Sequence, residues 1–207
     1  MTDGAAGPHP SLPGRLAPRG VADQEASWPV AASESFYDTS YVSLRRDTIV
    51  DPAGGQHQRA VVQPRSAVGV LALDDEDRLL LVAQYRHAVG RRMVELPAGV
   101  CDVEGEDALT TAARELAEEG DVQAAHWEHH LVVRSSPGYT SEALTVFRAT
   151  GLTPVPLDER TERHAEEADM AQWWMPFADA VDAVLDGRIS NGVAVGSILA
   201  EHARRTR

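Results

Sequence analysis

Three glutamates and one arginine gather in a short stretch, RELAEEGDV, which starts at Arg114. Successive helix residues rotate by about 100°, so Glu115, Glu118 and Glu119 would lie within an arc of about 100° on a helix. Like charges at these spacings repel one another, and no lysine in the stretch offsets them. Carboxylate oxygens gathered in this way are ligands that Mg²⁺ and Mn²⁺ prefer. The pattern therefore indicates either a divalent-metal site or a solvated acidic helix face.

The charge of the whole chain bears on this choice. The 207 residues carry a formal net charge of -13, which repels nucleic-acid phosphates and anionic lipid. We therefore expect neither a nucleic-acid partner nor a membrane surface. If the substrate is itself an anion, bound cations would offset the repulsion locally.

The compartment is indicated by what the sequence lacks. A single cysteine, Cys101, excludes an intramolecular disulfide and a Cys-rich zinc site. No apolar run reaches the ~18 residues that span a membrane, and the first residues lack the apolar core of a signal peptide. The sequence predicts a cytoplasmic protein.

The chain divides into three parts. Residues 1–33 are rich in Pro, Gly, Ala and Ser without periodicity, which predicts a disordered tail. Residues 34–64 hold two strand-like runs around DPAGGQ, typical of a β-hairpin, and order is expected to begin near Phe36. Residues 65–207 hold the apolar strands and the helices, with enough chain for a sizeable core.

The apolar runs of residues 65–207 predict an α/β layered sandwich with a mixed sheet. A helix is predicted over 107–119, with Leu109, Ala112, Ala113, Leu116 and Gly120 in its buried stripe and the carboxylates turned away. The predicted strands are 67–74, 78–85, 94–99, 129–135, 143–150 and 170–176.

Two details concern the C-terminal part. Trp173 and Trp174 should point to opposite faces of one strand, with one of them in the core. Helices are predicted over 177–185 and 190–203, and Ser190 is the expected N-cap of the second.

The string ELPAGVCDVEGEDALTTAARELAEEGDV resembles the Nudix hydrolase signature. Gly99, Glu106 and Arg114 match its first glycine, its isolated glutamate and its core arginine. The resemblance implies structural roles for all three, with Arg114 and Glu106 orienting the loop and the helix through an ion pair.

The match has two departures. One extra residue separates Gly99 from Glu106, in a loop that tolerates insertion. In addition, Gly120-Asp121 replaces the family order of any residue followed by glycine. Either Asp121 adopts the left-handed turn of the family glycine, or Gly120 ends the helix one residue earlier.

The resemblance implies a Nudix α/β/α sandwich that binds two to three Mg²⁺ or Mn²⁺ ions. Glu115 and Glu119 would be the main metal ligands, and Glu118 would assist them. The carbonyl of Ala98 would supply a further oxygen.

Other motifs, QYRHAVGRRMVELPAG, SSPGYTSEALTVFRATGL and EEADMAQWW, resemble the ADP-ribose pyrophosphatase branch of the family, especially its actinobacterial members. The branch implies that Glu167, or its neighbour Glu166, acts as the base or as an extra metal ligand. It places Glu142 near a ribose hydroxyl and Ser136 near a phosphate or ribose. The alternatives are a solvated acidic loop for the first pair and a turn residue for Glu142.

Arg86 follows a buried strand and is expected to reach a substrate phosphate, because guanidinium groups pair well with phosphate oxygens. Gln84 is expected to sit beside it in the substrate site.

The expected function is Mg²⁺-dependent hydrolysis of ADP-ribose to AMP and ribose 5-phosphate. The alternatives are hydrolysis of another nucleoside diphosphate sugar or of an oxidised nucleotide, and a non-catalytic nucleotide sensor on the same scaffold. A homodimer is expected, because the hairpin of residues 34–64 resembles the exchanged N-terminal module of the branch.

Overall fold

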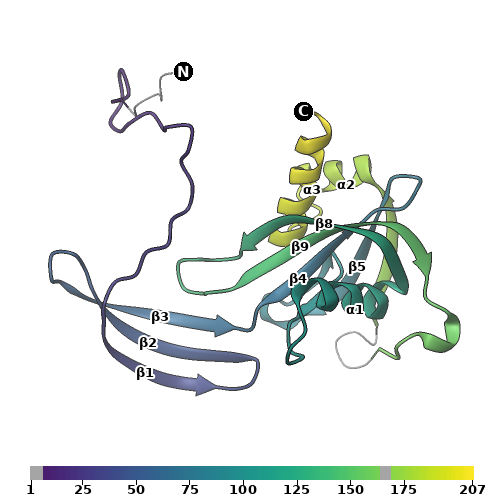
Figure 1. Ribbon diagram of the computed structural model, residues 1–207, viewed down its shortest axis with the longest axis horizontal. Helices are drawn as coiled ribbons and strands as arrows, with labels where there is room; N and C mark the ends of the chain where they lie inside the picture. The colour runs from purple at the N-terminus through teal and green to yellow at the C-terminus, as the bar shows by residue number, and fades with distance from the viewer. Residues whose placement is uncertain (1–6, 164–168) are drawn as a thin grey trace.

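A computed structural model describes residues 7–163 and 169–207, in which a three-stranded sheet projects from a larger layered domain (Figure 1). The projecting sheet consists of β1 (Val30–Asp38), β2 (Val42–Val50) and β3 (Gln56–Pro64), paired antiparallel in that order. β2 and β3 form the predicted hairpin. Its turn is held by Asp51, whose Oδ1 accepts hydrogen bonds from the amides of Ala53 and Gly55 at 2.8 Å each.

The strand β1 was missed by the sequence analysis, and order begins earlier than expected. β1 starts at Val30, inside the predicted tail and before Phe36. All nine of its residues are exposed, so its sequence, VAASESFYD, carries no core-facing period that would reveal a strand. Pairing with β2, from Val30 opposite Ile49 to Asp38 opposite Ser43, holds it instead.

Two sheets form the larger domain. One has the order β10-β5-β6 and the other the order β7-β4-β9-β8. The pairing of β4 with β9 is parallel and the other pairings within these sheets are antiparallel, so the mixed arrangement is confirmed. The strands are β4 (Ala67–Ala72), β5 (Arg78–Arg86), β6 (Arg91–Glu95), β7 (Ala98–Val100), β8 (Val122–Arg134), β9 (Ala143–Pro154) and β10 (Ala171–Pro176).

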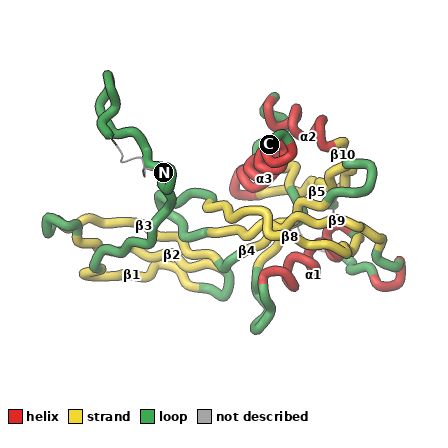
Figure 2. The backbone as a smooth tube through the Cα atoms, turned by 45° about the horizontal axis from the view of Figure 1, so that its top comes forward, coloured by secondary structure: helices red, strands yellow, loops and turns green. Residues whose placement is uncertain are grey.

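Helices cover both faces of these sheets, which gives the expected α/β/α sandwich. α1 (Ala108–Gly120) lies on one side, and α2 (Phe177–Leu185) with α3 (Gly192–Arg205) lies on the other (Figure 2). The core is accordingly split, with Leu80 and Leu116 in the cluster on the α1 side and Leu71 and Ile198 in the cluster on the other. No helix among the described residues is long and apolar enough to cross a membrane.

The buried face of α1 differs in part from the predicted stripe. Ala112, Leu116 and Gly120 are buried as predicted, but Leu109 is 40% exposed and Ala113 is exposed. Glu115 and Glu119 are buried in their place. The side chains of Glu115 and Glu119 lie against β7. The amide of Ala98 donates a hydrogen bond to Glu119, and Gly99 leaves space for the carboxylate of Glu115. The prediction that the carboxylates point away from the buried side was therefore wrong.

Two smaller expectations were also wrong. Ser190 is not the N-cap of α3, since Asn191 caps it by accepting hydrogen bonds from the amides of Val193 and Ala194 at 3.0 Å each. Neither Trp173 nor Trp174 is in the core, and their exposed fractions are 55% and 41%. Both lie on β10, the edge strand of its sheet, where neither face is fully covered.

The docking of α3 involves a buried histidine that makes stability depend on pH. His130 of β8 is 2% exposed, and its Nε2 lies 2.9 Å from the carbonyl oxygen of Ser197. Arg204 contacts its Nδ1 and its carbonyl oxygen. Burial lowers the pKa of His130 below its ordinary 6.5, and the positive charge of Arg204 adds to this, while the bond to Ser197 and the charge of Glu201 oppose it.

Below pH 6.5 the unfolded chain binds this proton more readily than the folded protein does. The contribution of His130 to stability is therefore complete above pH 6.5 and is lost as the pH falls toward its folded pKa. The loss amounts to at most about 1.4 kcal/mol per pH unit. Urea unfolding between pH 8 and 5 should show that His130→Gln flattens this dependence, whereas His129→Gln, at its exposed neighbour, does not. Equal pH dependence in the two variants would contradict the prediction.

Candidate active site

The helix α1 starts where the sequence supplies a capping residue. Asp107 is the N-cap, and its Oδ1 accepts a hydrogen bond from the amide of Thr110 at 2.8 Å. This cap sets the position of the next three turns, so that Glu115 and Glu119, at 8% and 3% exposed, come to lie against β7. Glu118 is more open, with 35% of its side chain exposed.

The strand β7 contacts both buried carboxylates through two adjacent residues. The amide of Ala98 donates a hydrogen bond to Glu119 Oε2 at 2.8 Å. A Cβ on Gly99 would lie 2.0 Å from Cδ of Glu115 and 2.1 Å from its Oε1, which no real contact allows. Gly99 is therefore a glycine because the carboxylate of Glu115 occupies the space of a side chain.

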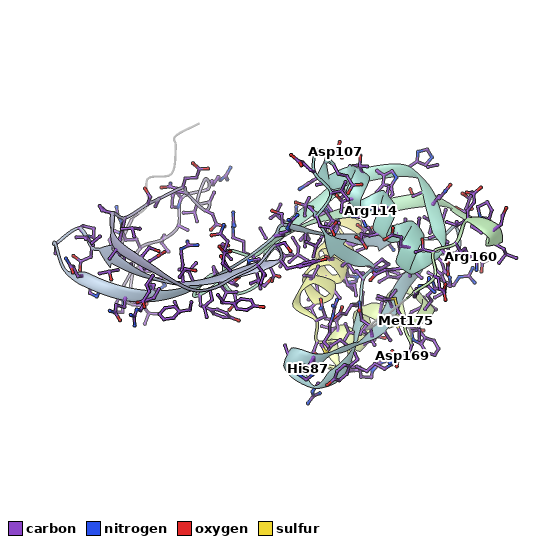
Figure 3. All side chains as sticks on the ribbon, turned by 90° about the horizontal axis from the view of Figure 1, so that it is seen from below. His87, Asp107, Arg114, Arg160, Asp169 and Met175 are labelled. Carbon is purple, nitrogen blue, oxygen red and sulfur yellow. The ribbon has the colours of Figure 1, made fainter. Side chains whose placement is uncertain are left out.

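Arg114, which is labelled in Figure 3, forms ion pairs with acidic residues of the loop and of the helix. Its Nη1 lies 2.8 Å from Glu115 Oε1 and 3.2 Å from Glu118 Oε2, and its Nη2 lies 3.3 Å from Glu106 Oε2. Glu106 also accepts a hydrogen bond from the hydroxyl of Thr111 at 2.9 Å. Burial lowers the pKa of Arg114, but the bond to Glu106 and the charges of Glu115 and Glu118 raise it above its ordinary value.

The donors of this cluster fit a hard divalent cation by their chemistry. Glu115, Glu118, Glu119 and the carbonyl of Ala98 offer only oxygen atoms, the type that Mg²⁺ and Mn²⁺ select. Within residues 7–163 and 169–207, no three Asp, Glu, His or Cys side chains converge on one point as they stand. A cation bound here would compete with Arg114 for the oxygens of Glu115 and Glu118.

A cavity of about 730 Å³ opens beside β7. Ala98 and Gly99 form part of its wall, and the ends of β5, β6 and β8 and the start of α3 complete it. Two predicted substrate residues, Arg86 and Glu142, line it. Ala98 and Gly99 of β7 thus contact the buried carboxylates of Glu119 and Glu115 and also line a ligand-sized cavity.

The other two predicted substrate residues are placed differently. Gln84 is 3% exposed and is not among the cavity wall residues that the structure describes. Ser136 is not among them either, but its neighbour Ser135 is, and the hydroxyl of Ser135 donates a hydrogen bond to Glu142. Ser135 thus lines the cavity where Ser136 was expected, and the role of Ser136 in substrate binding stays a prediction.

Sequence reasoning also missed the residues that hold Arg86. Its Nη2 lies 2.7 Å from Glu95 Oε2, and Nδ2 of Asn191 donates to Glu95 Oε1 at 3.0 Å. Glu95 is 4% exposed, so this ion pair is well shielded from water on the carboxylate side. A lone charge inside the apolar stretch MVEL was a signal that could have found Glu95, whereas nothing local to Asn191 points to the cavity.

The loop between β8 and β9 is fastened to the projecting sheet. The amide of Val62 in β3 donates to the carbonyl oxygen of Tyr139 at 2.8 Å, and the amide of Ser141 donates to that of Val62 at 3.1 Å. Ser135 and Glu142 border this loop and line the cavity, so the loop that connects two cavity residues is bonded to the projecting sheet.

The carboxyl end of α1 settles how the Gly-Asp departure is accommodated. Asp121 follows the helix with φ 54° and ψ 26°, in the left-handed region, so it takes the place of the family glycine. Its Oδ2 accepts hydrogen bonds from Arg163 Nη2 at 2.8 Å and Gln172 Nε2 at 3.0 Å. Burial raises the pKa of Asp121, but these two bonds and the charge of Arg163 lower it below its ordinary value.

The predicted base, Glu167, and its alternative, Glu166, lie outside the described residues. Their roles remain predictions from the sequence.

The chain has extensive similarity to known proteins. The NUDIX domain family matches residues 63–193. The ADP-ribose pyrophosphatase of Mycobacterium tuberculosis (strain ATCC 25618 / H37Rv) is 43% identical over 182 residues, which cover 88% of this chain and 86% of that protein. The ADP-ribose pyrophosphatase of Bacillus subtilis (strain 168) is 33% identical over 136 residues, 66% of this chain and 72% of that protein. A crystal structure of an ADP compounds hydrolase shares the fold, with a TM-score of 0.73, 19% identity, and coverage of 88% of this chain and 96% of that one.

Proposed function

We propose, since this chain belongs to the Nudix hydrolase family, that it hydrolyses ADP-ribose to AMP and ribose 5-phosphate with the help of Mg²⁺ or Mn²⁺. The observation that carries the proposal is the position of Ala98 and Gly99 in β7. These two residues contact the buried carboxylates of Glu119 and Glu115 and also line a cavity of about 730 Å³. Cavities of this size suit a small-molecule ligand.

The carboxylate cluster would hold two to three cations, with Glu115 and Glu119 as the main ligands and Glu118 and the Ala98 carbonyl as further donors. When bound, such ions offset the charge of a diphosphate and polarise its phosphoryl oxygens. An acidic chain of net charge -13 needs this compensation near an anionic substrate.

The residues of the cavity would orient the substrate. Arg86 lines the cavity and would offer its guanidinium to a phosphate, with its pairing to Glu95 orienting the group. Glu142, which lines the same cavity with Ser135, would accept a hydrogen bond from a ribose hydroxyl.

The proposed base is Glu167, which would accept the proton of the attacking water. We expect Glu167→Gln to lower kcat for ADP-ribose by about 100-fold or more, because the amide cannot take up a proton. Glu166→Gln, at the neighbouring residue, is the matched control and should lose less. The melting temperature of each variant separates loss of the base from loss of the fold. Turnover close to wild type in Glu167→Gln would show that another group is the base.

A substrate panel tests the activity itself. The value of kcat/KM should be highest for ADP-ribose among nucleoside diphosphate sugars and oxidised nucleotides, and AMP should be a product. A higher value for another compound would reassign the substrate within the family. Tight ADP-ribose binding without AMP release, in saturating Mg²⁺ and Mn²⁺, would instead favour a nucleotide sensor.

We also propose that two copies pair through the projecting sheet, in the cytoplasm. The support is the exposure of its aromatic side chains, with Phe36 at 56%, Tyr37 at 57% and Tyr41 at 62%. Several exposed aromatic side chains on one small sheet favour an interaction surface there. Light scattering at micromolar concentration should give the mass of two chains, and the mass of a single chain would contradict pairing.

A further inference from the structure

The helix α1 ends in a left-handed residue that is not glycine. Helices commonly place glycine there, because a Cβ makes this conformation costly. Here the glycine stands one position earlier, since a Cβ on Gly120 would lie 2.7 Å from Cδ2 of Leu80 in β5. Position 120 must therefore be glycine for α1 to pack on the sheet, and the left-handed position 121 is occupied by an aspartate.

The carboxylate of Asp121 gathers two donors over the end of the helix. Gln172 Nε2, bound to Asp121 Oδ2, also donates to the carbonyl oxygen of Glu119 at 2.7 Å. Arg163, bound to the same oxygen, donates to the carbonyl oxygens of Glu119 at 3.1 Å and Glu118 at 3.2 Å. We call Asp121, Arg163 and Gln172 the Asp121 clamp. It satisfies carbonyls that a helix end leaves without partners inside the helix.

The clamp acts on a residue that the metal site needs. The backbone carbonyl of Glu119 receives both donors of the clamp, and its side chain accepts the hydrogen bond from the Ala98 amide at 2.8 Å. Glu119 is therefore fixed at its backbone by the clamp and at its carboxylate by β7. Without the clamp, the last turn of α1 would be free to fray, as helix ends do.

We propose that Asp121 is a positioning residue of the metal site, which holds Arg163 and Gln172 over the carboxyl end of α1 and thereby keeps Glu119 in place for a divalent cation. The inference rests on the proposed function, because it assigns Glu119 to metal binding. It differs from a role in folding alone, since a glycine at position 121 suits the left-handed backbone better than aspartate does.

The test is Mn²⁺ binding by Asp121→Gly, measured by titration calorimetry on the full chain without substrate. We expect the dissociation constant for Mn²⁺ to rise about tenfold, the size of effect seen when groups that orient a metal ligand are removed. The melting temperature should stay close to wild type.

Asp77→Gly is the matched control. Asp77 also has a left-handed backbone, with φ 59°, and its carboxylate also binds an arginine, Arg205, at 2.8 Å. It lies in the turn between β4 and β5 and touches no residue of the clamp through the contacts described. Its Mn²⁺ affinity should equal that of the wild type.

A second variant covers the case in which Asp121→Gly does not fold. Arg163→Gln keeps the aspartate but removes the guanidinium, and we again expect about a tenfold loss of Mn²⁺ affinity. The double variant should lose little more Mn²⁺ affinity than the single variant that binds Mn²⁺ less tightly, because both changes disrupt the same clamp. Wild-type affinity in either single variant would overturn the positioning role.

The outcomes separate the inference from the function beneath it. If the wild type hydrolyses ADP-ribose with Mn²⁺ and the single variants bind Mn²⁺ equally well, only the role of Asp121 fails. If the wild type neither binds Mn²⁺ nor releases AMP, the proposed function fails and the inference fails with it.

Discussion

Glu119→Gln is expected to reduce kcat for ADP-ribose by at least about 100-fold at millimolar Mg²⁺. The substitution removes one charge from the cluster and replaces one carboxylate oxygen of Glu119 with an NH₂ group, which does not bind a cation. Metal ions supply several kcal/mol of transition-state stabilisation, and each 1.4 kcal/mol corresponds to about tenfold in rate. Turnover over a range of Mg²⁺ concentrations measures the loss.

The fold should survive this change. Glu119 is 3% exposed and accepts a hydrogen bond from the Ala98 amide, and the oxygen of a glutamine amide accepts the same bond. The melting temperature is therefore expected to stay near that of the wild type. Glu118→Gln is the control, because its side chain is 35% exposed and its proposed role is only to assist. Equal losses of kcat in the two variants would show that Glu119 is no more important for catalysis than Glu118.

Gly99→Ala is expected to lower kcat by a similar factor, about 100-fold, while leaving the protein folded. The new Cβ would lie 2.0 Å from Cδ of Glu115. The obstructing group is the end of a flexible side chain, so it will rotate away at little cost in stability. The carboxylate of Glu115 will then lie outside the place from which it would bind a cation, and lost charge stabilisation of this kind costs several kcal/mol.

Gly69→Ala supplies the comparison for this prediction. Gly69 of β4 pairs with Ala98, next to Gly99, but a Cβ there would meet Val193 Cγ1 at 3.5 Å and Val146 Cγ2 at 3.6 Å, which are ordinary contacts. Its kcat should stay within about threefold of wild type, as expected where no atom must move. The kcat values of both variants test the effect on activity, and their melting temperatures show whether both remain folded. Normal activity in Gly99→Ala would show that the position of Glu115 is not critical.

The sequence was most informative where one local signal dominated. The bounds of α1 followed to within one residue from apolar spacing, and β4 and β5 followed from their continuous apolar runs. The two faces of α1 were assigned wrongly because burial of Glu115 and Glu119 depends on β7, which lies elsewhere in the chain. The spacing of apolar residues alone cannot show that a charged helix face will pack against the backbone of a strand elsewhere in the chain.

Other misses arose where two neighbouring residues had equal local claims. Ser190 and Asn191 are both good N-caps, and only the direction in which the chain reaches α3 selects Asn191. Ser135 and Ser136 likewise share one loop, and the docking of that loop on β3 decides which of them faces the cavity. Gln84 fitted its motif, but the strand that carries it buries its side chain.

If two copies pair through the projecting sheet as proposed, the two hydrogen bonds between Val62 and the loop after β8 would also link activity to the concentration of the protein. They join that sheet to the loop whose flanking residues Ser135 and Glu142 line the cavity. Pairing of two copies and ordering of the cavity would then draw on the same free energy, so association would favour the catalytically competent form by mass action. Dilution below the dissociation constant of the pair should lower the turnover of each chain, and the specific activity would follow the protein's own abundance.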